Sequence, residues 1–243
     1  MDAIQKTPRK ALQAYYSVHS RIYDATRWSF LFGRGRLLGE VGLRLFPTRI
    51  LEIGCGTGVN LLRLGRLFPH ARLTGIDASA AMLGVARRRL RSMGDRVEFK
   101  EGYYDSPGGL DAPPDLVCLS YSLSMMNPGV EEVIAAVSAD LAPRGSIAVV
   151  DFLGSGHPWF RRWMRANHVR MEEHLLPLLE TRFHGDLIDV STAYGGLWRY
   201  FLFMGRPRAP RNSTFARPRM DQLLTGPSTG LKRQDEATAE LGP

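Results

Sequence analysis

The residues of this 243-residue chain that are best suited to chemistry stand in a glycine-rich segment, EIGCGTGVN, at positions 52–60. Its glycines, Gly54, Gly56 and Gly58, alternate with other residues. A turn of this kind between a strand and a helix lets a ligand approach the backbone closely, because no Cβ stands in the way. The dinucleotide fingerprint would need a glycine where Val59 stands, and no Gly-Lys-Ser/Thr of a P-loop follows. The segment therefore predicts a ligand site that is neither of these.

A carboxylate stands at the end of the next apolar run. Asp77 closes the segment ARLTGID, which is predicted to be the second strand of a sheet. One carboxylate can accept hydrogen bonds from both hydroxyls of a ribose. Asp77 is therefore the candidate partner for the ribose of a nucleoside ligand.

The elements that must position these residues are apolar runs of strand length that alternate with helical stretches. Strands are predicted at 49–55, 71–77, 97–102, 115–121 and 146–152. Helices are predicted at 58–68, 79–91 and 130–141, with Ser79 as the cap of the second. This alternation indicates an α/β fold in which helices cover both faces of a parallel sheet.

The pattern changes after Gly154. A helix is predicted at 157–183, interrupted near Pro177, and is followed by two strands, DLIDVSTAY and LWRYFLFMG, joined at Gly195–Gly196. Before the sheet, a helical region is predicted from about position 8 to about position 45. The predicted domains are an N-terminal helical lid at 1–45, a ligand-binding core at 46–205 and a basic tail at 206–243, which is disordered or a folded docking peptide.

Glu52, the three glycines, Asp77 and the closing pair of strands together resemble the class I S-adenosylmethionine-dependent methyltransferases over about residues 15–205. The resemblance implies a doubly wound, mostly parallel, Rossmann-like sheet of seven strands with a C-terminal antiparallel hairpin strand. It also implies S-adenosyl-L-methionine as the cofactor. A doubly wound fold without this cofactor is the alternative.

The resemblance assigns a role to each residue of the cofactor site. The glycines would pass beneath the methionine and ribose portions, and Glu52 would orient the loop or the amino end of the cofactor. Asp77 would hold the ribose, while Ala78 and Met82 would cover the adenine.

The chain departs from the family pattern after the third strand. Many relatives have Gly-Asp there, with the acid on the adenine amino group, whereas this chain has Gly102-Tyr103-Tyr104-Asp105. Either the backbone and Tyr103 make the adenine contact, or Asp105 reaches back to it.

The fourth strand ends in LSYSLSMMNPG, where family members that methylate base nitrogens or Gln side chains carry Asn/Asp-Pro-Pro-aromatic. Ser120-Tyr121-Ser122-Leu123 stands there instead and argues against base N-methylation. Ser120 and Tyr121 are predicted to face the reacting methyl group. Local helix capping by Ser122 or Ser124 is the alternative.

Three short segments resemble a narrower family, the methyltransferase of betaine lipid synthesis, which trimethylates the nitrogen of diacylglyceryl-homoserine. They are YDATRWSFLFGR, SYSLSMMN and YGGLWRYFLFMGRP, and they are also similar to bacterial phosphatidylethanolamine N-methyltransferases. This resemblance implies a lipid amine as the acceptor and a 3-amino-3-carboxypropyl transferase as the functional partner. The alternatives are a small-molecule or quinone O- or C-methyltransferase and a cofactor-binding or nucleic-acid-binding protein without catalysis.

Methyl transfer from a sulfonium to a neutral amine needs positioning rather than a metal or a covalent nucleophile. Aromatic faces would stabilise the cationic product, and an arginine fork would hold an acceptor carboxylate. The predicted cage residues are Tyr16, Tyr23, Trp28 and Tyr121. The predicted carboxylate partners are Arg27 and then Arg199, and the possible bases are Tyr121, Asp24 and His157.

The segment YDATRWSFLFGRG is predicted to be a helix with two working faces. Trp28, Leu31 and Phe32 stand at i, i+3 and i+4 and can form an apolar face over the sheet. Tyr23 and Arg27, four residues apart, would point at the cofactor and the acceptor.

The net charge of +8 is carried by the flanks, with +6 in residues 1–50, −1 in 51–204 and +3 in 205–243. Basic flanks suit an anionic membrane surface, while an Arg-rich genome-wide composition is the plain alternative. The chain begins without an apolar signal region and contains no apolar run long enough to span a bilayer. With two cysteines in apolar runs, we expect a cytoplasmic protein, peripheral on the inner face of the membrane at most, without a metal or a nucleic-acid partner.

Overall fold

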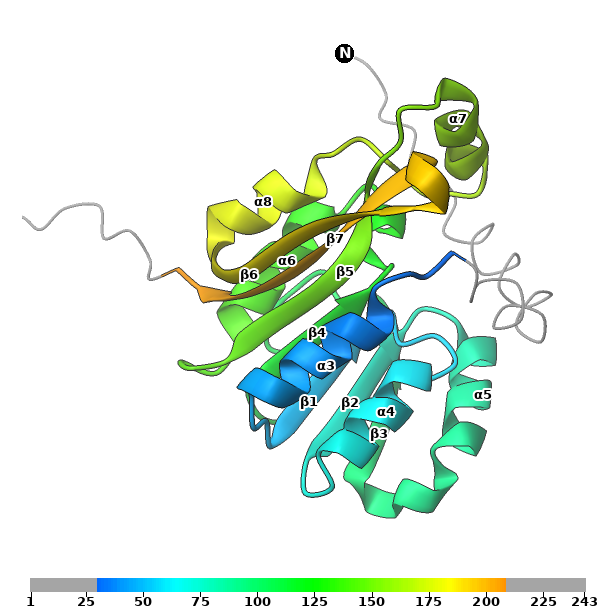
Figure 1. Cartoon of the computed structure of the whole chain (residues 1–243). Helices are drawn as coiled ribbons and strands as arrows, with labels where there is room; N and C mark the ends of the chain where they lie inside the picture. The colour runs from blue at the N-terminus through cyan, green and yellow to red at the C-terminus, as the bar shows by residue number, and fades with distance from the viewer. Residues whose placement is uncertain (1–29, 209–243) are drawn as a thin grey trace, which may run out of the picture. The chain divides into compact units, whose positions relative to one another are not determined.

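A seven-stranded sheet in the order β3-β2-β1-β4-β5-β7-β6 organises residues 30–208, the part of the chain that the computed structural model describes (Figure 1). The strands are β1 (Arg49–Ile53), β2 (Arg72–Asp77), β3 (Val97–Glu101), β4 (Leu116–Ser120), β5 (Ser146–Gly154), β6 (Phe183–Ala193) and β7 (Trp198–Pro207). Neighbouring strands from β3 to β5 pair in parallel, and β7 pairs antiparallel with both β5 and β6. The predicted fold class, including the reversed C-terminal strand, is confirmed.

The helices cover both faces of this sheet. They are α3 (Arg34–Arg44), α4 (Val59–Leu67), α5 (Ala80–Arg89), α6 (Val130–Asp140), α7 (Pro158–Ala166) and α8 (Leu175–Arg182), with short 3-10 turns η1 (Arg91–Arg96), η2 (Leu123–Met125) and η3 (Tyr194–Gly196). One apolar core contains buried residues from α3, α4, α5 and α7, and the other contains those of α6 and α8. Adjacent residues of one strand, such as Ile50 and Leu51, belong to opposite cores, as the period of a strand requires. Within the described residues no helix is long and apolar enough to cross a membrane.

The helix predicted at 157–183 is interrupted, but the predicted position of the break, near Pro177, is wrong. The chain leaves helical conformation at Asn167–His174, where His168 and Glu173 adopt left-handed φ values of 62° and 58°. Pro177 instead lies in the first turn of α8, where the missing N–H would have had no intrahelical partner.

The predicted helical face through Leu31 and Phe32 is also wrong. Both residues precede α3, which begins only after Gly33 at a φ of 78°. Leu37, Leu38 and Val41 then supply the apolar stripe that packs into the core. The other residues of that segment, Tyr23, Arg27 and Trp28 among them, lie outside the described residues. So do most of the predicted lid at 1–45 and nearly all of the predicted tail, and the domain boundaries stay predictions.

We expect glycine substitutions in β7 and α3 to have opposite effects on stability. A Cβ on Gly205 would clash with the backbone carbonyl of His184 in the neighbouring strand, so Gly205→Ala should destabilise the fold by about 1–3 kcal/mol. Gly39 lies in α3 with open space around it, so Gly39→Ala should stabilise by roughly 0.5–1 kcal/mol. Urea unfolding of both variants measures this, and equal shifts of the same sign would contradict the assigned environments.

Candidate functional site

The three glycines after β1 all have left-handed backbone conformations, but they differ in the space around them. Their φ values are 70° at Gly54, 53° at Gly56 and 76° at Gly58. A Cβ on Gly54 would lie 2.6 Å from Cβ of Ser122, and one on Gly58 would lie 2.7 Å from Cδ1 of Leu90. A Cβ on Gly56 would meet nothing within 4 Å. The turn is therefore packed on both sides and open at Gly56, where a ligand can approach the backbone.

Asp77 joins this turn to the one that follows β2. Its Oδ2 accepts a 2.7 Å hydrogen bond from N–H of Gly56, and its Oδ1 accepts one of 2.9 Å from N–H of Ser79. Burial raises the pKa of Asp77, and these two backbone donors oppose the rise. Each oxygen keeps acceptor capacity for a ligand hydroxyl. Ser79 caps α5 as predicted, because its Oγ accepts from N–H of Met82.

Glu52 lies near the carboxyl end of β1, an inner strand of the sheet, with 1% of its surface exposed. Its Oε1 accepts a 2.8 Å hydrogen bond from Nδ2 of Asn60, while its Oε2 has no hydrogen-bond partner among residues 30–208. Burial raises the pKa of Glu52 to about 7, and Asn60 and the positive charge of Arg34 oppose the rise. A buried carboxylate oxygen without a partner is costly, and a cationic donor from a ligand would satisfy it.

More buried polar atoms without partners belong to the same region. Asn60 Oδ1 and Ser122 Oγ have no hydrogen-bond partner in the described part of the chain. Ser122 lies directly against Gly54. Native interiors leave few such atoms, so their concentration beside the glycine turn points to a polar ligand.

Ser120 and Tyr121, both predicted to face the methyl group, contact the segment around α3. Ser120 Oγ accepts a 3.0 Å hydrogen bond from Nε of Arg34. The Tyr121 hydroxyl donates to the carbonyl of Phe32 at 2.7 Å, and its ring packs against Phe152. Burial raises the pKa of Tyr121, so it is a neutral anchor here rather than a base.

The residues predicted to contact adenine follow β2 and β3. Ala78 is half-buried, and Met82 is buried in the first turn of α5. Gly102, at a φ of 153°, donates its N–H to the carbonyl of Asp77. Tyr103 and Asp105 are both exposed, so the two alternatives for the adenine contact stay open.

Two residues of this region were missed in the sequence. Arg34 starts α3 and reaches Ser120, although nothing in the sequence links positions 86 residues apart. Asp151 is fully buried in β5, where its Oδ2 accepts from N–H of Ser124 and its Oδ1 from N–H of Phe152. Burial raises its pKa to about 6. An acid inside the apolar run SIAVVDF is a signal that could have identified Asp151.

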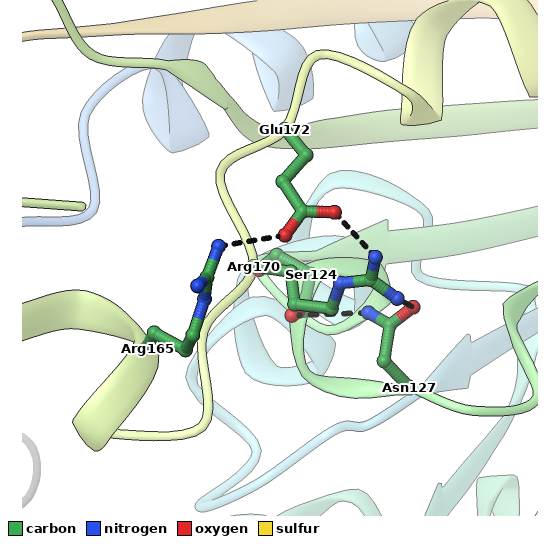
Figure 2. A network of polar contacts seen from close by, with 5 residues as sticks. All are labelled: Ser124, Asn127, Arg165, Arg170 and Glu172. Atoms are coloured by element: carbon green, nitrogen blue, oxygen red, sulfur yellow. Dashed lines mark hydrogen bonds and ion pairs between the residues drawn. The ribbon is translucent and has the colours of Figure 1, made fainter. Parts of the chain in front are cut away.

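The segment between α7 and α8 is fixed to the turn after β4. Figure 2 shows Glu172 between the guanidinium groups of Arg165 and Arg170, and Arg170 also donates to Asn127 Oδ1 at 3.2 Å. The N–H of Arg170 donates to the carbonyl of Ser124 at 2.9 Å. A cavity of about 390 Å³ adjoins this network and is lined by Arg161, Arg165, Val169, Met171, Glu172 and Glu173.

The remaining predicted acceptor residues are not gathered into one site. Arg199 forms an ion pair with Glu173, and His157 is exposed at the start of α7. Tyr16, Tyr23, Asp24, Arg27 and Trp28 lie outside residues 30–208. Within those residues, no group of three or more His, Cys, Asp or Glu side chains could hold a metal ion.

Comparison with known proteins identifies the class of the domain. Residues 50–145 match the family model described as a methyltransferase domain. This match confirms the predicted enzyme class of the domain, and two methyltransferases of similar fold were solved with S-adenosyl-L-homocysteine, the demethylated form of the predicted cofactor. The match is to a methyltransferase domain in general, and the narrower betaine lipid family stays a prediction.

The curated relatives are matched only in part. Trans-aconitate 2-methyltransferase of Paracidovorax citrulli is 38% identical over 117 residues, which cover 46% of this chain and 42% of that protein. The chain spans 37–42% of the length of the first curated relatives it matches.

Solved structures share the fold. The N-methyltransferase NodS of Bradyrhizobium japonicum WM9, in complex with S-adenosyl-L-homocysteine, is similar with a TM-score of 0.60 and 20% identity, over 72% of this chain and 86% of that one. The [4+2]-cyclase SpnF is similar with a TM-score of 0.66 and 17% identity, over 86% of this chain and all of that one. At these identities the likeness concerns the fold alone.

The buried carboxyl of Glu52 should make stability depend on pH. Its folded pKa of about 7 exceeds its ordinary value of 4.5, so the folded state binds more protons and loses stability as pH rises between these values. The variant Glu52→Gln loses the pH dependence that comes from Glu52. It keeps that of Asp151, whose pKa is also raised by burial, so the difference between the two proteins isolates Glu52. In urea unfolding without cofactor, we expect the stability of the native chain relative to Glu52→Gln to fall by about 2–3 kcal/mol from pH 5 to pH 8. A pH-independent difference would contradict the assignment.

Proposed function

We propose that this chain transfers a methyl group from S-adenosyl-L-methionine to an acceptor molecule. The observation that carries the proposal is the unpartnered Oε2 of buried Glu52 beside the open glycine turn. A cofactor with an ammonium group and a ribose would satisfy that oxygen and the remaining acceptor sites of Asp77. The residues present therefore fit the cofactor of the matched domain.

The chain's own residues would contribute by positioning rather than by covalent chemistry. When bound, the cofactor supplies an electrophilic methyl group on a sulfonium. Glu52 would hold the ammonium end, Gly56 would allow close approach of the backbone, and Asp77 would fix the ribose. Fixing both reactants in an in-line arrangement can supply several kcal/mol of barrier lowering. The acceptor amine must arrive neutral, and its proton can leave to water.

Cofactor binding should depend on Asp77 and not on acidic residues elsewhere. Asp77→Ala removes the carboxylate that would accept from the ribose, together with its hydrogen bond to N–H of Gly56 in the glycine turn. We therefore expect at least a tenfold loss of affinity for S-adenosyl-L-homocysteine. Asp111→Ala is the matched control, because that side chain is 92% exposed and outside the turn. Isothermal titration calorimetry measures both, and an unchanged affinity of Asp77→Ala would remove the proposed site.

For the acceptor, we propose the amine of a lipid headgroup, with diacylglyceryl-homoserine as the preferred substrate and phosphatidylethanolamine as the alternative. The resemblance of the segments at 120–127 and 194–207 to betaine lipid enzymes supports this. Homoserine also carries a carboxylate. The cavity beside α7 is lined by two arginines, Arg161 and Arg165, and two glutamates, Glu172 and Glu173. Arg170 and Arg199 form ion pairs with these glutamates, so guanidinium groups that could hold a carboxylate gather around the cavity.

A second acceptor class is favoured by the curated relatives. Trans-aconitate 2-methyltransferase is named for a small carboxylic acid, and the arginines at the same cavity would accept one. The two classes differ in the atom that is methylated and in the presence of acyl chains. Quinone acceptors, considered from the sequence, gain no support from this charged cavity.

The acceptor proposal is tested by lipid mass spectrometry after co-expression with a 3-amino-3-carboxypropyl transferase. We expect trimethylated homoserine lipid with the native chain and none with Asp77→Ala. Absence of the product from cells that contain the unmethylated lipid would reject this acceptor. Methyl esters formed from trans-aconitate in a parallel assay would then favour the acid class.

A further inference from the structure

We propose that α7 and the adjacent tip of the β6–β7 hairpin form a face that docks on an anionic lipid membrane. This docking face consists of Trp159, Arg162, Trp163 and Tyr194, with Arg161 and Arg165 beside them. It goes beyond the proposed methyl transfer, because membrane docking requires neither the cofactor nor an identified acceptor.

The helix α7 exposes its largest apolar side chains. Trp159 is 63% and Trp163 is 48% exposed, and the two stand four residues apart on one side of the helix. Phe160 and Met164, also four residues apart, are buried and attach the helix to the core. A pair of exposed tryptophans on a helix that already has a buried apolar face indicates an interaction surface.

The hairpin tip extends this surface. Tyr194, in η3, is 57% exposed, and Figure 1 shows the tip of the β6–β7 hairpin beside α7. Ring contacts connect the two elements, since Phe30 lies 6.0 Å from Trp163 and 5.4 Å from Trp198, which lies 5.0 Å from Tyr194. The exposed rings therefore rest on a packed aromatic base and are held in position for a common partner.

The charge of the face selects the partner. The sequence PWFRRWMRA of α7 contains three arginines and no acid. Arg165 pairs with Glu172, whereas Arg162 forms no ion pair with any residue of the described range. Tryptophan and tyrosine favour the depth of lipid headgroups, and guanidinium groups bind phosphates, so this composition matches an anionic bilayer surface.

Other occupants fit less well. A second copy of the chain would bring like charges together, which is unfavourable. A single nucleic-acid strand is usually bound in a groove that follows its backbone, whereas the tryptophans lie one turn apart on a short helix.

The docking face lies at the carboxyl edge of the sheet, because α7 begins at Pro158, shortly after β5 ends at Gly154. Docking there would bring the edge that carries Glu52 and Asp77 to the headgroups.

The test is co-sedimentation of the full chain with vesicles of phosphatidylcholine and phosphatidylglycerol. We expect the double variant Trp159→Ala/Trp163→Ala to lower the partition coefficient at least tenfold and Arg162→Glu to lower it severalfold. Phe46→Ala is the matched control, because Phe46 is an 88% exposed aromatic that precedes β1 at the opposite edge of the sheet. Its binding should equal that of the native chain.

Three outcomes would overturn the proposal. The first is that the native chain does not bind the vesicles, and the second is that the double tryptophan variant binds them as well as the native chain does. The third is that the native chain binds a single-stranded oligonucleotide and the variants lose that binding while they still bind vesicles normally. Calorimetry with S-adenosyl-L-homocysteine on the same preparations reports folding and cofactor binding. A failure of docking is thereby distinguished from a failure of the proposed enzyme activity.

Discussion

The carboxylate of Asp77 is the constraint on which the carboxyl edge of the sheet depends. It accepts the N–H of Gly56, while the preceding carbonyl, that of Ile76, accepts the N–H groups of Gly54 and Cys55. The carbonyl of Asp77 itself accepts the N–H of Gly102 after β3. The turns after β1, β2 and β3 are therefore hydrogen-bonded around two consecutive residues. The group that would hold a ribose also shapes the loop beneath it, so fold and ligand binding are linked at one side chain.

Two buried carboxylates in neighbouring parts of the sheet, Asp151 and Glu52, differ in how their oxygens are hydrogen-bonded. Asp151 uses both oxygens on backbone N–H groups of Ser124 and Phe152, and it thereby fixes the turn after β4. Glu52 uses one oxygen on Asn60 and leaves the other without a partner in the described residues. Burial raises the pKa of both carboxyl groups, so the direction of the shift does not distinguish them. They are distinguished by the oxygen of Glu52 that has no hydrogen-bond partner.

The sheet and the glycine turn could be predicted because their signals are local. Apolar runs and left-handed glycines are properties of a few adjacent residues, and the positions of β1 to β5 follow from them. The bonds from Arg34 to Ser120 and from Tyr121 to Phe32 join residues 86 and 89 positions apart, and no spacing in the sequence indicates them. The error at Pro177 has another cause, since proline is compatible with the first turn of a helix as well as with its end.

Evidence for the cofactor and evidence for the acceptor come from different parts of the chain. The family match covers residues 50–145, which include the glycine turn and the strands β1 to β4. The cavity beside α7 and the docking face belong to residues 155–198, beyond that match. In this later part the backbone departs from regular structure at Asn167–His174 and is held by ion pairs around Glu172. If the proposed acceptor site is the cavity beside α7, acceptor choice would depend on side chains that lie outside the matched domain.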